Sequence, residues 1–221
     1  MLINNTMRPG DHDVMLEGVV GHLEAVLTIP EHRNPTYVAL LGHPHSLQGG
    51  TMNNKVVTTL VRVFKELGIA SLRFNFRGVG KSQGVYDAGI GESEDMLLIA
   101  NQLTQAIPSA QCVFAGFSFG SYVAYRAAAH HSSALLITVA PAVQHYDYQA
   151  FHPAPMPWNL VQGDEDEVVP SDAVYAFAAA QTPSICVLRF PEATHFFHGQ
   201  LIALKTRLMN AVFSKLAGVG C

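Results

Sequence analysis

Short apolar segments typical of buried strands alternate with helical segments along most of the chain, and this alternation restricts the possible folds more than any other feature. After a β-hairpin expected at residues 14–30, strands are predicted at 37–45, 69–76, 111–117, 134–143, 158–169 and 184–193. Helices are predicted at 53–68, 91–108, 118–131, 171–181 and 201–218. Apolar strands connected by helices indicate a mostly parallel sheet covered on both faces. The predicted fold class is α/β, with a doubly wound sheet and an N-terminal antiparallel hairpin.

We expect one domain, residues 1–221, because no repeat, low-complexity segment or linker divides the chain. A length of 221 residues supplies enough apolar material for one core. The stretch from Pro141 to Trp158 contains four prolines, so it is too short and too irregular to form a separate lid domain. A fold without a lid is therefore predicted.

Composition argues against several classes of protein. The chain is 49% hydrophobic and 14% charged, but no apolar run reaches the roughly 18 residues that a membrane span requires. The first residues lack the basic start and apolar run of a secretory signal. The net charge of -4, without a cluster of Lys or Arg, argues against nucleic acid as a partner. We expect neither a membrane span nor a nucleic-acid interface.

The three cysteines, Cys112, Cys186 and Cys221, are too few and too scattered for a disulfide framework or a cysteine metal site. Cys112 and Cys186 lie inside apolar runs and are expected in the core. A reduced, cytoplasmic setting is the interpretation that best fits this pattern.

A serine flanked by glycines stands where a strand is predicted to turn into a helix. Ser118 is the centre of Gly116-Phe117-Ser118-Phe119-Gly120. A sharp strand-to-helix turn strains the central residue and exposes its side chain, and it requires small residues on either side. The helix N-terminus then offers free N–H groups beside the serine. This context predicts that Ser118 is a nucleophile.

A serine nucleophile needs a base, and the base needs an acid that orients it. For this kind of turn the chain order is serine, then acid, then histidine. The acidic segment 164–167 follows one later strand, and His195 follows the next. His195 is therefore the predicted base, and His198 is expected to be a helix cap or a neighbouring group.

At these motifs the chain resembles the α/β-hydrolase superfamily, and the resemblance covers nearly the whole sequence. It is similar to small serine hydrolases without a lid in the segments GHPHSLQGGTMNNKVV, FNFRGVGKSQG, GFSFGS, GDEDEVVP and THFFHG. The resemblance implies a carboxylesterase or related acyl hydrolase that needs no cofactor. It also implies that Asp166 is the acid, because Gly163, Asp166 and Val169 match the superfamily spacing. Asp164 is the alternative, and Glu165 and Glu167 are expected to be solvated.

Acyl transfer also needs N–H donors for the developing oxyanion. One is expected from the backbone of Phe119, directly after the nucleophile. Superfamily members often supply the second from a His-Gly pair, but this chain has His43 and Pro44 there. Proline has no N–H, so His45 or Ser46 is predicted to donate instead.

Two other motifs suggest different chemistry and are weaker. The segment HPH could be part of a metal site, but no third ligand is evident, so no metal is predicted and His43 is expected to pack beneath its loop and bond to backbone. Gly80-Lys81-Ser82 resembles the end of a phosphate-binding loop, but position 75 is Asn where that motif requires Gly. Arg77 is instead expected to be tied into local structure, and it could also line the mouth of the site.

Aromatic residues border the predicted site. Phe196, Phe197 and Tyr122 are predicted to contact an apolar acyl group, with a core position as the alternative, favoured for Tyr122 and for Phe117. Segment 145–158 could form one wall. The expected partner is a small-molecule acyl substrate; the sequence does not indicate its identity or the oligomeric state.

The predicted function is hydrolysis of a carboxylic ester of a small or medium acyl group through an acyl-serine intermediate. A thioesterase, or an acyl-peptide or dipeptide hydrolase, would use the same three residues, because substrate choice depends on the loops. A non-catalytic binding protein on the same fold is a remote alternative, since Ser118, Asp166 and His195 are all present.

Overall fold

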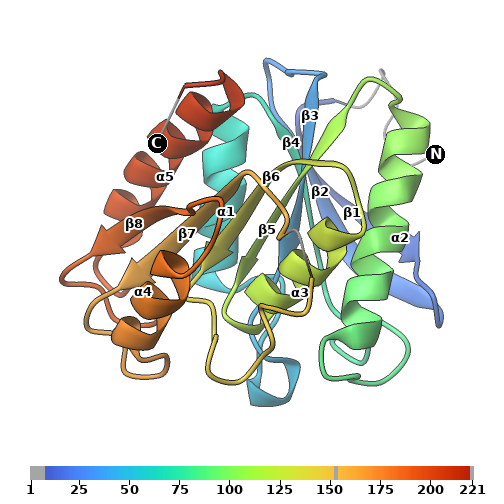
Figure 1. Cartoon of the computed structure of the whole chain (residues 1–221). Helices are drawn as coiled ribbons and strands as arrows, with labels where there is room; N and C mark the ends of the chain where they lie inside the picture. The colour runs from blue at the N-terminus through green and yellow to red at the C-terminus, as the bar shows by residue number, and fades with distance from the viewer. Residues whose placement is uncertain (1–7, 152–153, 220–221) are drawn as a thin grey trace.

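The computed structural model describes residues 8–151 and 154–219, and their strands form one sheet (Figure 1). Its order is β1-β2-β4-β3-β5-β6-β7-β8. The strands are β1 Gly10–Glu17, β2 His22–Ile29, β3 Tyr37–Gly42, β4 Ala70–Phe74, β5 Gln111–Phe117, β6 Ser133–Val139, β7 Trp158–Gly163 and β8 Cys186–Phe190. The β1–β2 and β2–β4 pairs are antiparallel, and the other pairs are parallel. The predicted fold class is confirmed.

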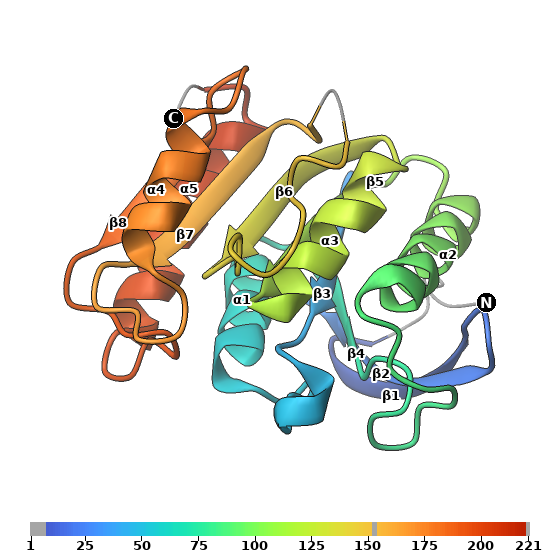
Figure 2. The ribbon, with the colours of Figure 1, turned by 60° about the horizontal axis from the view of Figure 1, so that its bottom comes forward.

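Helices cover both faces of the sheet. They are η1 Ser46–Gln48 (a 3-10 turn), α1 Lys55–Glu66, α2 Ile90–Ala106, α3 Phe119–Ala129, α4 Ser171–Ala179 and α5 Leu201–Leu216. α1 and α5 lie on one face, and α2, α3 and α4 lie on the other (Figure 2). Successive strand residues alternate between the two cores: Leu40 packs in the core under α2 and α3, whereas Leu41 packs in the core under α1 and α5. This is why the strands are apolar on both faces.

The ends of several elements differ from the sequence prediction. The hairpin begins at Gly10 and not at residue 14. Asn54 caps α1 by accepting the N–H of Val56, and Gly68 has a positive φ of 73° just after that helix. The serine that opens the segment 171–181 predicts Ser171 as the cap of α4, but Ser171 is the first helical residue and Pro170 the cap. Its hydroxyl donates instead to the carbonyl of Asp164.

The segment between β6 and β7 contains no helix or strand among its described residues, in agreement with the predicted absence of a lid. Its aromatic side chains pack on α3. Tyr146 stacks on Tyr122 with ring centroids 4.7 Å apart, and Tyr148 lies 5.0 Å from Tyr125. These contacts hold the segment against α3, beside the strand-to-helix turn at Ser118 (the elbow) from which α3 begins.

The two described cysteines differ in redox state. Cys112 is a free and fully buried thiol, as expected of a core residue. Cys186 is also buried, but it is disulfide-bonded. Cys186 is therefore in the core, as expected, but the expectation that it is reduced is wrong. Cys221 lies outside the described residues. None of the described helices is long and apolar enough to cross a bilayer.

Candidate active site

The carboxyl ends of the parallel strands meet at one edge of the sheet, which Figure 2 turns toward the viewer. Ser118 lies there between β5 and α3, with φ 53° and ψ −119°. A non-glycine residue rarely adopts this strained conformation. A Cβ at Gly116 would lie 2.0 Å from the carbonyl oxygen of Gly120, and one at Gly120 would lie 2.4 Å from Gly42. The tight elbow and its need for small neighbours are as the sequence predicted.

Ser118, His195 and Asp166 form a chain of hydrogen bonds. The Ser118 hydroxyl lies 3.1 Å from His195 Nε2, and His195 Nδ1 lies 2.9 Å from Asp166 Oδ2. The side chains of His195 and Asp166 are 3% and 0% exposed, so little water competes for these bonds. With Nδ1–H donating to the carboxylate, Nε2 is free to accept a proton from the serine. The structure brings together the three residues that the sequence singled out.

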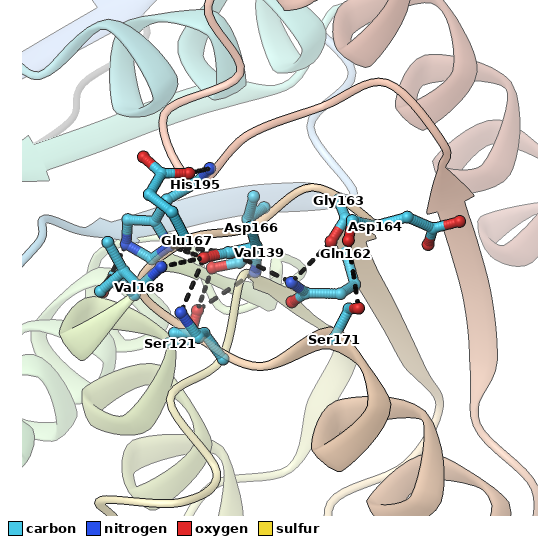
Figure 3. A network of polar contacts seen from close by, with 12 residues as sticks. Ser121, Val139, Gln162, Gly163, Asp164, Asp166, Glu167, Val168, Ser171 and His195 are labelled. Atoms are coloured by element: carbon cyan, nitrogen blue, oxygen red, sulfur yellow. Dashed lines mark hydrogen bonds and ion pairs between the residues drawn. The ribbon is translucent and has the colours of Figure 1, made fainter.

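Asp166 is saturated with donors. Its Oδ1 accepts the N–H groups of Val168 at 2.9 Å and Val169 at 2.7 Å, and its Oδ2 accepts from Gln162 Nε2 at 3.0 Å (Figure 3). Burial opposes ionisation, but the bonds from His195 and from the backbone outweigh it and lower the pKa of Asp166. The carboxylate therefore stays charged beside the imidazole.

The other acidic residues of this loop have separate partners. Asp164 pairs with Arg189 at 2.9 Å and accepts a bond from Tyr175, so it does not contact His195. Glu167 was expected to be solvated. It is exposed, but its carboxylate accepts the backbone N–H of His195 at 3.1 Å, so that expectation was incomplete. Glu165 is exposed, as expected.

The candidate oxyanion donors come from two adjoining loops. Phe119 is the first residue of α3, and the His45 ring lies 5.1 Å from the Phe119 ring. His45 Nδ1 accepts the N–H of Leu47, and its Nε2 lies 3.1 Å from the Tyr86 hydroxyl. Burial lowers the pKa of His45, which favours the neutral ring, in which Nδ1 can accept this bond. Ser46 follows as the first residue of η1. The loop of His45 thus lies beside the start of α3, where Phe119 directly follows Ser118.

His43 is buried and bonds to backbone at both ring nitrogens, as predicted. Its Nδ1 donates to the carbonyl of Pro44 at 2.7 Å, and its Nε2 accepts the N–H of Phe76 at 3.0 Å. Burial lowers the pKa of His43 from 6.5 to about 4. The neutral ring therefore connects the loop after β3 to the loop after β4.

Of the three residues predicted to contact substrate, one lies at the surface beside His195. Phe196 is 39% exposed, and its ring lies 5.0 Å from the His195 ring. Phe197 is fully buried and packs on Phe190, so its predicted role at the substrate site is wrong. Tyr122 is 8% exposed beneath Tyr146, so it too belongs to the core, as the alternative interpretation held.

Two further sequence predictions, for His198 and Arg77, have clear outcomes. His198 does not cap α5, because Gln200 occupies that position; the His198 ring packs against Phe196. Arg77 is 5% exposed and donates to Asp95 at 2.8 Å, so it is tied into local structure and does not line the site. In the part of the chain that the structure describes, no three His, Cys, Asp or Glu side chains are grouped to hold a metal ion.

Comparison with known proteins identifies the family and agrees with the fold. A family model described as serine aminopeptidase, S33, matches residues 46–159. An α/β serine hydrolase homologue from Coxiella burnetii is 41% identical with a TM-score of 0.89, and the match covers 93% of this chain and 99% of that one. XC6422 from Xanthomonas campestris, described as an α/β serine hydrolase without a lid, is 39% identical with a TM-score of 0.88, covering 95% and 96%.

A curated relative, an uncharacterized protein from Rickettsia prowazekii, is 39% identical over 142 residues, and the chain spans 60% of its length. Together with the near-complete matches above, these similarities place the chain in a known class: it belongs to the α/β-hydrolase superfamily, among the serine hydrolases. The superfamily resemblance stated from the sequence is thereby confirmed.

Proposed function

We propose that this protein hydrolyses carboxylic esters of small or medium acyl groups through an acyl-serine intermediate. The observation that carries the proposal is the hydrogen-bonded chain from the Ser118 hydroxyl through His195 to Asp166, at 3.1 Å and 2.9 Å. A strained serine next to a helix N-terminus and a neutral imidazole is the arrangement that activates a hydroxyl for attack on a carbonyl carbon.

In this mechanism Ser118 Oγ attacks the acyl carbon while its proton passes to His195 Nε2. Asp166 accepts the Nδ1–H of the resulting imidazolium and stabilises its charge. The N–H of Phe119, with that of His45 or Ser46, stabilises the oxyanion. His195 then protonates the leaving alcohol. His195 finally takes a proton from water, which attacks the acyl-serine, and returns that proton to Ser118 Oγ as the acyl–oxygen bond breaks and the acid leaves. No step requires a cofactor.

A peptidase is the second candidate, because the matching family model is described as a serine aminopeptidase. The same three residues can cleave an amide, and the choice depends on how the site binds the leaving group. Phe196 is the one exposed aromatic side chain that contacts His195 among the described residues. It offers an apolar surface beside His195 for an acyl group, which favours the ester.

A panel of substrates tests the proposal. The purified protein would be assayed with p-nitrophenyl esters of increasing chain length, acyl-CoA thioesters and aminoacyl anilides. We expect the highest kcat/KM for an ester of short or medium length. A preference for aminoacyl anilides would establish the peptidase instead, and a preference for acyl-CoA would establish a thioesterase. If the folded protein hydrolysed none of these substrates, the remote alternative of a non-catalytic binding protein would be favoured.

A further inference from the structure

Gln162 is a buried amide in contact with the acid of the proposed triad. It is the penultimate residue of β7 and is 0% exposed. Its Nε2 donates to Asp166 Oδ2 at 3.0 Å and to the carbonyl of Gly163 at 3.0 Å (Figure 3). Oδ2 is also the oxygen that accepts from His195 Nδ1 at 2.9 Å. Gln162 and His195 therefore bind the same carboxylate oxygen.

The orientation of the Gln162 amide follows from its neighbours. If the amide were flipped, Oε1 would face the Asp166 carboxylate and the Gly163 carbonyl, and both contacts would be repulsive. In the observed orientation Oε1 is buried without a hydrogen-bond partner among the described residues. A buried acceptor without a partner destabilises a fold, and the strand positions around it, Leu160 and Val161, are apolar. Stability alone would favour an apolar residue at this position.

We propose that Gln162 is a positioning residue that fixes the Asp166 carboxylate for His195 and limits the negative charge on Oδ2. This inference rests on the proposed function. Val168 and Val169 bind Oδ1, Gln162 binds Oδ2, and His195 Nδ1 lies 2.9 Å from Oδ2 and 3.1 Å from Oδ1. Loss of the Gln162 donor leaves Oδ2 bound only by the imidazole. The carboxylate can then rotate, and Oδ2 becomes a stronger acceptor.

The second effect has a definite sign in a pH profile. A more strongly accepting Oδ2 favours the protonated imidazolium, which cannot act as the base. The acidic limb of kcat/KM therefore moves to higher pH when the donor is removed. Other titratable groups lie on the elements around His195. They include Glu165 and Glu167, Asp164 with Arg189 and Tyr175, Asp172 on α4, Glu192, His198, and His43 and His45 on the loop after β3. All remain in the variants described below.

The test compares Gln162→Met, which keeps the length of the side chain and removes the donor, with Asn159→Leu. Asn159 is a matched control: it is an amide on the same strand, 1% exposed, and neither amide atom has a partner among the described residues. It faces the opposite core, beside Asn210 and Ser214 of α5. For Gln162→Met we expect kcat to fall about tenfold, with KM changed less than about twofold. The acidic limb should rise by about half a pH unit. Asn159→Leu should leave all three values unchanged.

Gln162→Leu provides a second variant without the donor in case Gln162→Met does not fold. A proton NMR spectrum supplies a readout that does not depend on turnover, namely the downfield resonance of His195 Nδ1–H. We expect it to move in either Gln162 variant and to stay in place in Asn159→Leu. The inference is overturned if a folded Gln162 variant matches Asn159→Leu in both the pH profile and this resonance. If wild-type protein hydrolyses no acyl substrate, the proposed function fails, and the resonance alone still decides whether Gln162 sets the state of the His195–Asp166 pair.

Discussion

His43 and His195 are both buried histidines on loops at the carboxyl edge of the sheet, but they bond to different kinds of groups. His43 is 0% exposed and is held by the carbonyl of Pro44 and the N–H of Phe76. His195 is 3% exposed and lies between the carboxylate of Asp166 and the hydroxyl of Ser118. One ring connects two backbone segments, and the other connects an acid to a nucleophile.

The comparison separates the effect of burial from the effect of partners. Without a charged partner, burial lowers the pKa of His43 to about 4, so this ring stays neutral over the physiological range. His195 is almost as deeply buried, but the Asp166 carboxylate can stabilise its imidazolium. A buried histidine is therefore suited to proton transfer only where a carboxylate compensates for the charge that it gains.

Substitution of the proposed catalytic residues should have the largest effect. We expect His195→Ala and Ser118→Ala each to lower kcat by about 10⁴- to 10⁶-fold, because the proton acceptor or the nucleophile is lost. The fold should persist, as circular dichroism would show. Steady-state assays with the best ester of the panel measure the loss. A His195→Ala protein within tenfold of wild type would remove His195 from the mechanism.

Two aspartates on one loop provide the next test. Asp166→Asn should lower kcat by about 10⁴-fold, because the amide can no longer stabilise the imidazolium. Asp164→Asn should change kcat/KM by less than about threefold, since its partners are Arg189 and Tyr175 and not His195. If the two variants lost activity equally, the choice of Asp166 over Asp164 would be wrong.

For His43 the expected loss is in stability. His43→Leu leaves the Phe76 N–H and the Pro44 carbonyl without their partner, and each buried group costs about 1–3 kcal/mol. Urea denaturation should show a lower free energy of unfolding, with an unchanged m-value, the slope of that free energy against urea concentration. Unchanged stability would mean that His43 does not hold the two loops together.

The pH dependence of stability should report the same ring. Its pKa is about 4 in the folded protein against an ordinary value of 6.5, so the unfolded chain binds the extra proton first. The unfavourable free energy of charging the buried ring is therefore absent above pH 6.5, and it lowers the free energy of unfolding progressively as the pH falls toward 4. It amounts to about 3 kcal/mol. Urea titrations across this range should show the loss in wild type and a smaller one in His43→Leu.

His198→Ala should have the smallest effect. The ring is exposed and contacts Phe196 but neither Ser118 nor Asp166, so activity should stay within about twofold of wild type. Loss of turnover in His198→Ala, with retention in His195→Ala, would reverse the assignment of the base.

The fold and the hydrogen-bonded chain of Ser118, His195 and Asp166 could be predicted because local patterns determine them. Apolar strands alternating with helices define a parallel sheet, and the two glycines around Ser118 follow from an elbow in which no Cβ fits. His195 and Asp166 could be placed from chain order, because parallel strands deliver their following loops to the same edge.

The residues that surround the hydrogen-bonded chain of Ser118, His195 and Asp166 could not be predicted in the same way. Gln162 stands in an apolar strand, and its contact with Asp166 depends on the path of the loop that follows. Phe196 and Phe197 are adjacent and chemically identical, but a positive φ of 53° at Phe197 turns its side chain into the core. Sequence pattern does not specify such a local turn. An amide in this buried strand occurs at both Asn159 and Gln162, so the sequence alone does not single out Gln162.

Covalent labelling with a fluorophosphonate probe tests the central claim most directly. Intact-mass and peptide mass spectrometry would be applied to folded wild-type protein and to Ser118→Ala. The account predicts one adduct per chain, on the peptide that contains Ser118. Ser118→Ala should carry no adduct. Folded wild-type protein that resists the probe, or a Ser118→Ala protein labelled equally well, would contradict the account.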